Sequence, residues 1–512
     1  MRRLAVPLAG NLLMMLLGLA STKLMAGQYA PQDFGLVAYV NGLTVLFAIL
    51  ADLGLGLAHI KKLGDGADPK DCVRVYLTVK IGLMLLVAVP MSLFIGVFVP
   101  LQSNLPRSDV WLVSGVMIAA WFFSFLSHWI GYTFAGLQDM KRQFTIEVAR
   151  SASLLLFLAL TAATAGQALQ LALGYLAASL VSLAVALVLI WPYLGGRFDR
   201  ALLSEYRALA VPIGAGLLLV NVARNCDGLL LTAATSLHEA GLYYAAKRIT
   251  SPLEVTGGYI GHMALPYIAS LDAANRETIA PYVGRLEQVL TVLFGPVMAF
   301  ALFFAGPVSL ALLGPQYAGA APALGLLGAA FAVATITVPY SSVPTGIGVP
   351  KVAAWIAGLS AGIWLVGSLV LVPARLGGVP LLGWGAAGMA AAFLGASVVR
   401  SALERRASAR LVAARATRGT TATALISFLA AGGVAAAAHV AGWRIDSVAS
   451  VAVAFAAVLA LHAALLVATG LVSPQDLRRW AGLVTPDSAR RGAPMPPAHG
   501  SSETEMPNPF SE

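Results

Sequence analysis

Fourteen long apolar runs follow one another along the sequence. Crossing the hydrocarbon core of a bilayer takes about 20 mostly apolar residues. Of all residues 59% are apolar and 11% are charged, whereas a soluble domain carries about 25% charged residues. We therefore expect an all-α integral membrane protein with about fourteen transmembrane helices. The runs fall at roughly 4–28, 36–60, 75–100, 110–135, 145–165, 169–192, 209–233, 240–265, 286–313, 320–345, 352–373, 384–402, 421–442 and 446–472.

Lysine and arginine are distributed unevenly between the segments that join these runs. If the N-terminus lies in the cytoplasm, most of the 33 lysines and arginines fall in cytoplasmic segments or at the helix ends beside them. Positive residues collect on the cytoplasmic side of membrane proteins, so we predict a cytoplasmic (inner) membrane protein with both termini in the cytoplasm. The net charge of +10 then reflects topology and does not argue for nucleic acid. Outer loops are predicted near Ala30, Arg107, Gly166, Ser236, Ala318, Gly377 and Trp443.

A segment near the N-terminus recurs in the middle of the chain. LAVPLAGNLL at 4–13 returns as LAVPIGAGLL at 209–218, an offset of 205 residues. QDFGLVAY at 32–39 returns as HEAGLYYA at 238–245, an offset of 206. Six apolar runs separate equivalent points, and an even number of crossings returns the chain to the same side, so the two copies are predicted to be parallel.

The repeat divides the chain into two pseudo-symmetric lobes of six helices each, at 1–195 and 205–402. Two lobes with a cleft between them are a natural geometry for alternating access. A basic cytoplasmic loop and two extra transmembrane helices, outside the duplication, occupy 403–472. The last segment, 473–512, is rich in Pro, Ser and Gly and is predicted to be a disordered cytoplasmic tail.

Three stretches resemble one family of membrane proteins. The first helix, followed by APQDFGLVAY and a helix ending in ADLGLGLA, is similar to the opening of Wzx-type polysaccharide flippases. NCDGLLLTAATSLHEAGLYYAAKRI resembles their seventh and eighth helices. TGIGVPKVAAWIAGLS, LVLVPARLGG and WGAAGMAAAFL resemble a later stretch, with Val372 in place of an Ile. Over roughly 4–402 the chain therefore resembles the multidrug/oligosaccharidyl-lipid/polysaccharide flippase superfamily.

The resemblance implies a transporter and not an enzyme. Such proteins move polyprenyl-linked oligosaccharides, the repeat units of a polysaccharide, from the cytoplasmic to the outer leaflet. The implied partners are the lipid-linked oligosaccharide, membrane lipids, a polysaccharide polymerase and other export machinery, with no nucleic acid. The sequence contains no G-x-x-x-x-G-K-[ST], H-E-x-x-H or C-x-x-C pattern, so we expect no catalytic residue, no metal and no cofactor.

Ionisable residues inside the expected spans are the candidates for a transport site. Each costs about 2.5–3.5 kcal/mol on insertion scales, so it usually faces a cavity or a partner. Lys23, Arg224 and Arg248 are the predicted substrate-binding residues, because ammonium and guanidinium groups suit the oxygens of a lipid diphosphate. Asp227 and Glu254 are the candidates for ion coupling, because a carboxyl group in a cavity can release and take up a proton.

Purely structural interpretations of the same residues stay open. Arg224 or Lys23 could pair with Asp227 and only hold helices together. Lys247 lies near the start of its helix and is expected to reach the outer interface. His128 lies toward the cytoplasmic end of its helix, where a solvated histidine is common.

Rival functions also stay open. A multidrug cation antiporter of the same fold would need a net acidic cavity, whereas the bases outnumber the acids here. The lipid II flippase branch shares the pattern from Tyr244 to Arg248. A membrane scaffold would not need buried charges, and a polyprenyl glycosyltransferase would need sizeable soluble loops that the sequence lacks.

Overall fold

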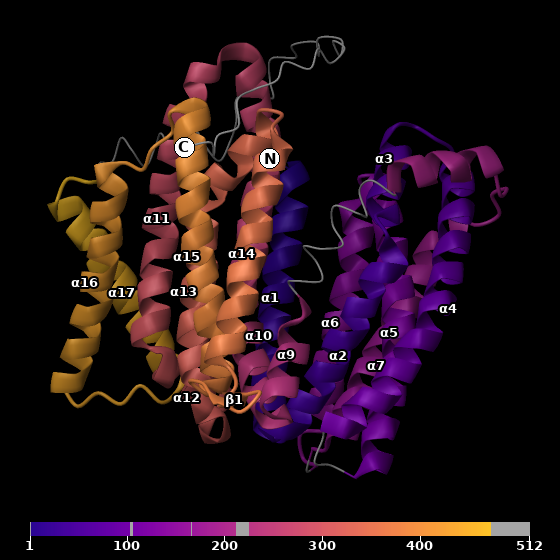
Figure 1. Cartoon of the computed structure of the whole chain (residues 1–512), viewed down its shortest axis with the longest axis horizontal. Helices are drawn as coiled ribbons and strands as arrows, with labels where there is room; N and C mark the ends of the chain where they lie inside the picture. The colour runs from indigo at the N-terminus through magenta and orange to yellow at the C-terminus, as the bar shows by residue number, and fades with distance from the viewer. Residues whose placement is uncertain (1, 103–105, 165, 211–224, 473–512) are drawn as a thin grey trace. The chain divides into compact units, whose positions relative to one another are not determined.

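The computed structural model describes residues 2–102, 106–164, 166–210 and 225–472, and nearly all of these are helical (Figure 1). The first half contains α1 (Arg2–Gln28), α2 (Pro31–Asp52), α3 (Leu55–Gly64), α4 (Pro69–Gln102), α5 (Arg107–Gly136), α6 (Met140–Leu160), α7 (Ala168–Ile190) and η1 (Trp191–Tyr193). The second half contains α9 (Asp227–Ala234), α10 (Leu237–Asn275), η2 (Arg276–Thr278), α11 (Ile279–Phe303), α12 (Ala305–Leu313), η3 (Pro315–Ala320), α13 (Ala321–Gly346), α14 (Pro350–Leu371), α15 (Gly385–Val412), α16 (Arg418–Val440) and α17 (Val448–Ala468).

Within these described ranges, eleven helices are long and apolar enough to cross a membrane, and each matches one of the fourteen expected runs. The other three runs fall on α1, on α10 and on residues 209–233. Helices α1 and α10 have 27 and 39 residues, which is ample length at about 1.5 Å per residue. Lys247, Arg248 and Glu254 lower the hydropathy of α10, and residues 211–224 lie outside the described ranges. The expected all-α, multi-pass membrane fold is confirmed.

One expected run is divided in two. The run at 36–60 ends as a membrane helix at Asp52, and the separate ten-residue helix α3 begins at Leu55. Between them Leu53 and Gly54 adopt left-handed conformations with φ of 45° and 77°. Only glycine adopts this region without strain, so Gly54 is the residue that lets the chain turn here. The apolar character of α3 explains why the sequence pattern runs on through the turn.

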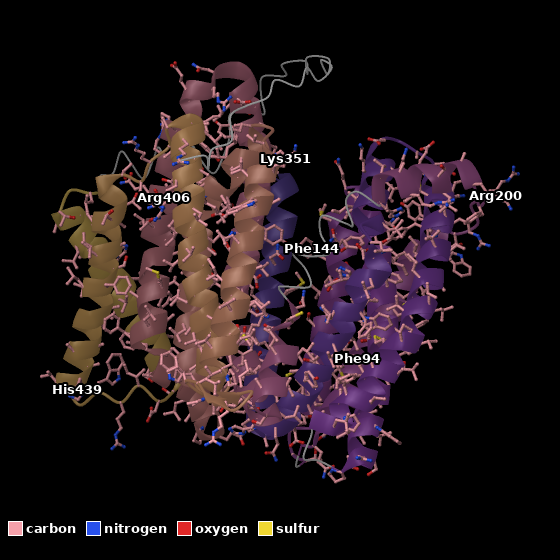
Figure 2. The ribbon with its side chains drawn as sticks, viewed as in Figure 1. Phe94, Phe144, Arg200, Lys351, Arg406 and His439 are labelled. Atoms are coloured by element: carbon pink, nitrogen blue, oxygen red, sulfur yellow. The ribbon has the colours of Figure 1, made fainter. Side chains whose placement is uncertain are left out.

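The first of two compact units comprises residues 1–252, 308–327 and 361–393. Within it α2, α4, α5, α6 and α7 pack side by side, and α1 packs on α6 (Figure 1). The ring of Phe144, labelled in Figure 2, fills the space left by the missing side chain of Gly10 on α1. One apolar core of this unit is formed by Val73, Ile130, Phe134, Ile146, Ala186 and Ile190.

The second unit comprises residues 253–307, 328–360 and 394–512. Here α11 packs against α16 and α17, the two helices that follow the duplicated part of the chain (Figure 1). Its core contains Ala264, Ile268, Ile279, Val283, Tyr340, Val343 and Ala414. The boundaries between the units fall inside α10, α12, α13, α14 and α15, so each of these helices supplies residues to both units.

Two strands, β1 (Arg375–Leu376) and β2 (Val379–Pro380), form a hairpin in the described part of the chain. Gly377 and Gly378 make its two-residue turn with φ of 56° and 87°. Both values are in the left-handed region that a tight hairpin turn requires. The hairpin lies at the predicted outer loop near Gly377, between α14 and α15.

Candidate transport site

Asp227 is buried in the first unit and has a specific partner. It begins α9, its side chain is 5% exposed, and it forms an ion pair with Lys247 of α10. Lys247 also lies over the ring of Tyr243, with Nζ 5.9 Å from the centroid. This differs from the expectation that Lys247 would reach the outer interface. The sequence missed the pair because it connects two helices whose relative rotation the apolar pattern does not determine.

Arg248 lies one residue further along α10 and has a neutral partner. Its Nη1 donates a hydrogen bond to the hydroxyl of Tyr175 on α7 at 2.6 Å. Helix α10 starts at Leu237, earlier than the expected run, so Arg248 lies about 16 Å along it. The arginine comes from the predicted second lobe and the tyrosine from the first, and both belong to the first unit.

Lys23 is exposed on α1 and does not reach Asp227. Its Nζ donates to the backbone oxygen of Ala311 at 2.7 Å, in the last turn of α12. Carbonyl groups at the C-terminal end of a helix carry partial negative charge, which favours an ammonium group there. The Lys23–Asp227 pair considered above is therefore not formed, because another lysine holds the carboxylate.

The remaining two predicted site residues lie outside the described part of the first unit. Arg224 lies outside the described residues. Glu254 is on α10 but belongs to the second unit, in a half-buried position. The structure therefore brings together Asp227, Lys247, Arg248 and Tyr175, and separately Lys23 with α12.

The starts of α2 and α10 meet backbone to backbone. A Cβ atom on Gly35 would lie 1.9 Å from the carbonyl oxygen of Leu237, and one on Gly241 would lie 1.8 Å from that of Pro31. Gly241 follows Gly35 by 206 residues, and Leu237 follows Pro31 by 206. The two contacts are therefore equivalent under the sequence repeat, and only glycine fits at either position.

A second pair of contacts obeys the same offset. The carboxylate of Asp33 accepts a hydrogen bond from the backbone of Ala168, at the start of α7. Oε2 of Glu239, 206 residues later, accepts one from the backbone N–H of Ala386 at 2.7 Å, at the start of α15. Carboxylates are stabilised at helix N-termini by the exposed N–H groups and the helix dipole. Because α7 and α15 are the sixth expected spans of their lobes, the repeat is visible in the contacts as well as in the sequence.

Further hydrogen bonds tie the predicted outer loops of the first unit together. The hydroxyl of Tyr317 donates to the backbone oxygen of Tyr29 at 3.0 Å, and Nε2 of Gln316 approaches the same oxygen at 3.3 Å. A Cβ on Gly166 would lie 2.7 Å from the backbone oxygen of Gln28. Loops that the topology prediction assigns to one side of the membrane thus lie at one end of this unit.

Two ion pairs, each with one fully buried side chain, were not predicted from the sequence. Lys80 of α4 has a fully buried side chain, pairs with Asp52 and lies 4.7 Å from the centroid of the Trp129 ring. In the second unit Glu287 of α11, also fully buried, accepts bonds from Arg405 at 2.6 Å and from the Tyr340 hydroxyl at 2.7 Å. Both Lys80 and Glu287 lie inside expected apolar runs, which is the signal that could have identified them. Their complete burial fits a structural role, since breaking such a pair would leave an uncompensated charge.

The segment that connects the predicted lobes is anchored on the first unit. Tyr206 is buried and its hydroxyl is hydrogen-bonded to Nδ1 of His59 on α3 at 2.7 Å. Nε2 of His59 is hydrogen-bonded to Oγ1 of Thr133 at 3.0 Å, and Glu205 forms an ion pair with Lys62. Burial, and secondarily the nearby charge of Lys80, lowers the pKa of His59 to about 3. The histidine is therefore neutral at physiological pH.

Proteins of known structure share this architecture. The lipid II flippase MurJ in an inward closed conformation superposes with a TM-score of 0.69 at 11% identity, covering 91% of this chain and 99% of that one. An inward-facing multidrug resistance MATE family transporter of the MOP superfamily gives 0.64 at 15% identity, covering 78% and 95%. A MATE transporter from Vibrio cholerae gives 0.52 at 15% identity, covering 80% and 96%. At these identities the comparisons establish the fold alone.

Helices, repeat and contacts together define a multi-pass membrane protein with the fold of the MOP superfamily transporters. Residues 24–322, more than half of the chain, match the family described as polysaccharide biosynthesis protein. The chain belongs to that family, which confirms the resemblance drawn from the sequence. No curated protein matches the chain in sequence.

Proposed function

We propose that this protein flips polyprenyl-linked oligosaccharides from the cytoplasmic to the outer leaflet of the cytoplasmic membrane by alternating access. Membership of the polysaccharide biosynthesis family supports a role in building a polysaccharide. The transporter fold supports movement of a substrate, as opposed to its synthesis. The polymerase that would receive the flipped unit, and further export machinery, are the proposed protein partners.

The contact between Arg248 and Tyr175 is the observation that carries the proposal. A guanidinium group about 16 Å along a transmembrane helix must face water, an acid or an anionic ligand. Here its Nη1 is held by a neutral hydroxyl at 2.6 Å, so this contact does not neutralise the charge. Guanidinium can bind phosphate oxygens in bidentate fashion, which suits the diphosphate of a polyprenyl-linked sugar. Arg248 is therefore the principal proposed substrate ligand, with Lys23 and Arg224 as the others.

Asp227 is a proposed coupling residue because a proton on its carboxylate would change the net charge of the Asp227–Lys247 pair. While Asp227 is ionised, Lys247 is neutralised by the ion pair. A proton on Asp227 would release the ammonium group toward the substrate. Glu254 is the second proposed coupling residue, in the other unit of the chain.

The glycine contacts at the starts of α2 and α10 support the alternating-access part of the proposal. They join the two predicted lobes at the end where the outer loops are expected. An opening toward the outside would have to separate Gly35 from Leu237 and Gly241 from Pro31. Because each contact is backbone to backbone, separation exposes two carbonyl oxygens that water can solvate.

Two other substrates are consistent with the fold. Lipid II, for which the flippase MurJ is named, is also a substrate of the polyprenyl diphosphate class, so Arg248 would serve either. A multidrug cation, suggested by the MATE structures, is disfavoured by the positive charge of Arg248 in the site.

Deletion of the gene tests the proposal. It should abolish a surface polysaccharide and leave its lipid-linked units on the cytoplasmic leaflet, while peptidoglycan synthesis continues. Arrest of peptidoglycan synthesis would support lipid II as the substrate instead. Unchanged polysaccharide together with new sensitivity to cationic dyes would contradict the flippase assignment.

A further inference from the structure

Three titratable side chains on α5 and α6 form a cluster that the transport site above does not use. Nδ1 of His128 lies 3.1 Å from Oε1 of Glu147, and Nη2 of Arg150 donates to Oε2 of the same carboxylate at 3.2 Å. The glutamate thus bridges an imidazole and a guanidinium group. All three residues belong to the first unit.

The geometry determines where a proton would bind. An ionised carboxylate is only an acceptor, so Nδ1 of His128 must carry the hydrogen in its contact with Glu147. The second ring nitrogen, Nε2, is then the position that takes up a further proton from a hydronium ion, leaving water. Without that proton the cluster is neutral, and with it the cluster carries one positive charge.

The cluster lies within the membrane-spanning part of its helices. His128 is about 12 Å before the end of α5 at Gly136, and Glu147 is about 10 Å after the start of α6 at Met140. Yet the side chains of His128, Glu147 and Arg150 are 49%, 22% and 40% exposed. Ionisable residues inside membrane-spanning segments almost always face the bundle interior or a water-filled cavity, and they pair with one another. By contrast, the side chains of Lys80 and Glu287 are fully buried. Complete burial suits those two residues to structural pairing alone.

The helices around the cluster supply a limited set of other ionisable groups. The ring of Tyr132 lies 4.9 Å from that of His128, on the same helix. Behind Tyr132 are Asp52 of α2 and Lys80 of α4, which neutralise each other. Helix α3 contributes the buried His59 together with Lys61 and Lys62, and α1, which packs on α6, contains Arg2, Arg3 and Lys23. The sequence of α7 contains no charged residue. Glu147 is therefore the carboxylate that responds to protonation of the imidazole.

We propose that His128, with Glu147 and Arg150 as its counter-ions, is a proton-binding site open to water inside the membrane, and that its protonation is coupled to transport. The coupling to transport rests on the proposed function, whereas the proton-binding site does not. Closing a cavity over a neutral cluster requires less desolvation than closing it over a charged one. Proton release from Nε2 is therefore linked to the loss of water from around the cluster, and proton uptake to its return.

Carbethoxylation of histidine by diethylpyrocarbonate tests the proton site without any substrate. The reagent reacts with neutral imidazole and not with the protonated ring. Mass spectrometry of the labelling of each histidine as a function of pH therefore reports its protonation. With the full-length protein in lipid nanodiscs, His128 should be labelled along with the exposed His439, while the buried His59 is protected (Figure 2 shows His439). Glu147→Gln should shift the pH of half-maximal labelling of His128 and leave that of His439 unchanged, because it removes the carboxylate beside the His128 ring. Absence of labelling at His128, or an unchanged half-maximal pH in Glu147→Gln, would overturn the proton site.

A second measurement tests the coupling. In proteoliposomes, flipping of a fluorescent polyprenyl diphosphate disaccharide should respond to an imposed pH gradient in the wild type. His128→Gln should lose that response, while the matched control His439→Gln keeps it. A full response in His128→Gln would overturn the coupling. If the wild-type protein flips no lipid with or without the pH gradient, the proposed function is contradicted. The labelling result would still decide whether His128 binds a proton.

Discussion

Gly35 of α2 and Gly241 of α10 occupy equivalent positions of the sequence repeat, and each faces the backbone at the start of the other's helix. The contact is reciprocal: Leu237, which Gly35 meets, is itself the repeat equivalent of Pro31, which Gly241 meets. Such a two-fold contact follows from two parallel copies related by an axis along the membrane normal. The contact explains why glycine is required at these two positions, which the sequence alone does not distinguish from the rest of its 51 glycines.

The first prediction concerns this contact. Gly35→Ala and Gly241→Ala should each force the starts of α2 and α10 apart, because a Cβ would lie within 2 Å of a carbonyl oxygen. In a protein whose own cysteines are replaced by serine, a Ser236→Cys reporter should then label faster with an impermeant maleimide added from outside. Gly395→Ala is the matched control, since nothing lies within 4 Å of a Cβ there. Equal labelling rates in all three alanine variants would contradict the proposed closure at this end.

The second prediction concerns the buried pair of Asp227 and Lys247. Asp227→Asn should leave an ammonium group without its counter-ion and destabilise the protein by about 3–5 kcal/mol, the range for breaking buried pairs. Lower abundance and a lower thermal unfolding midpoint in detergent would report the effect. Adding Lys247→Met should restore stability, because it removes the unpaired charge. A single variant as stable as the wild type would show that the pair contributes nothing.

The third prediction concerns Arg248. Arg248→Ala should abolish polysaccharide export while the protein inserts and accumulates normally, because the partner it loses is a neutral hydroxyl. Arg248→Lys should recover export only in part, since an ammonium group cannot bind a diphosphate in bidentate fashion. Tyr175→Phe should retain most of the export. Reduced abundance of Arg248→Ala, matched to its loss of export, would point to a structural role.

The fourth prediction uses the low pKa of His59. The docked histidine stays neutral down to about pH 3, whereas a solvated one binds a proton below about pH 6.5. Acid therefore favours the undocked state, and docking of Tyr206 should weaken by about 2 kcal/mol between pH 6.5 and pH 5. The thermal unfolding midpoint should fall over this range in the wild type and fall less in His59→Gln. Parallel pH profiles for the two proteins would contradict this account of the anchor.

The sequence predicted the membrane fold well because apolar length is a property of each segment alone. It also located the repeat, and the contacts of Asp33 and Glu239 follow that repeat. Partners inside the membrane were harder to predict. Lys247 lies only one residue from Arg248, yet one pairs with an acid on α9 and the other with a hydroxyl on α7. Which way each side chain faces depends on how the helices rotate against one another, and an almost uniformly apolar sequence carries little information about that rotation.

The orientation of the chain remains a prediction from the distribution of lysine and arginine. In the second unit Lys351 and Arg406 lie at one end and His439 at the other (Figure 2). With outer loops near Ala318, Gly377 and Trp443, the predicted topology puts Lys351 and Arg406 on the cytoplasmic side and His439 at the outer end of its helix, which agrees with this arrangement. Arg200, in the segment joining the predicted lobes, is exposed and would also be cytoplasmic (Figure 2).

In the proposed function the protein moves a polyprenyl diphosphate saccharide between leaflets, with Arg248 as its main ligand. The most direct test reconstitutes purified protein in liposomes that contain a fluorescent polyprenyl diphosphate disaccharide in both leaflets, and adds an impermeant reductant outside. Liposomes with the wild-type protein should lose nearly all fluorescence, because lipid in the inner leaflet reaches the outer one. Liposomes with Arg248→Ala should lose about half, as protein-free liposomes do. Loss of about half with the wild type, or complete loss with Arg248→Ala, would contradict the account.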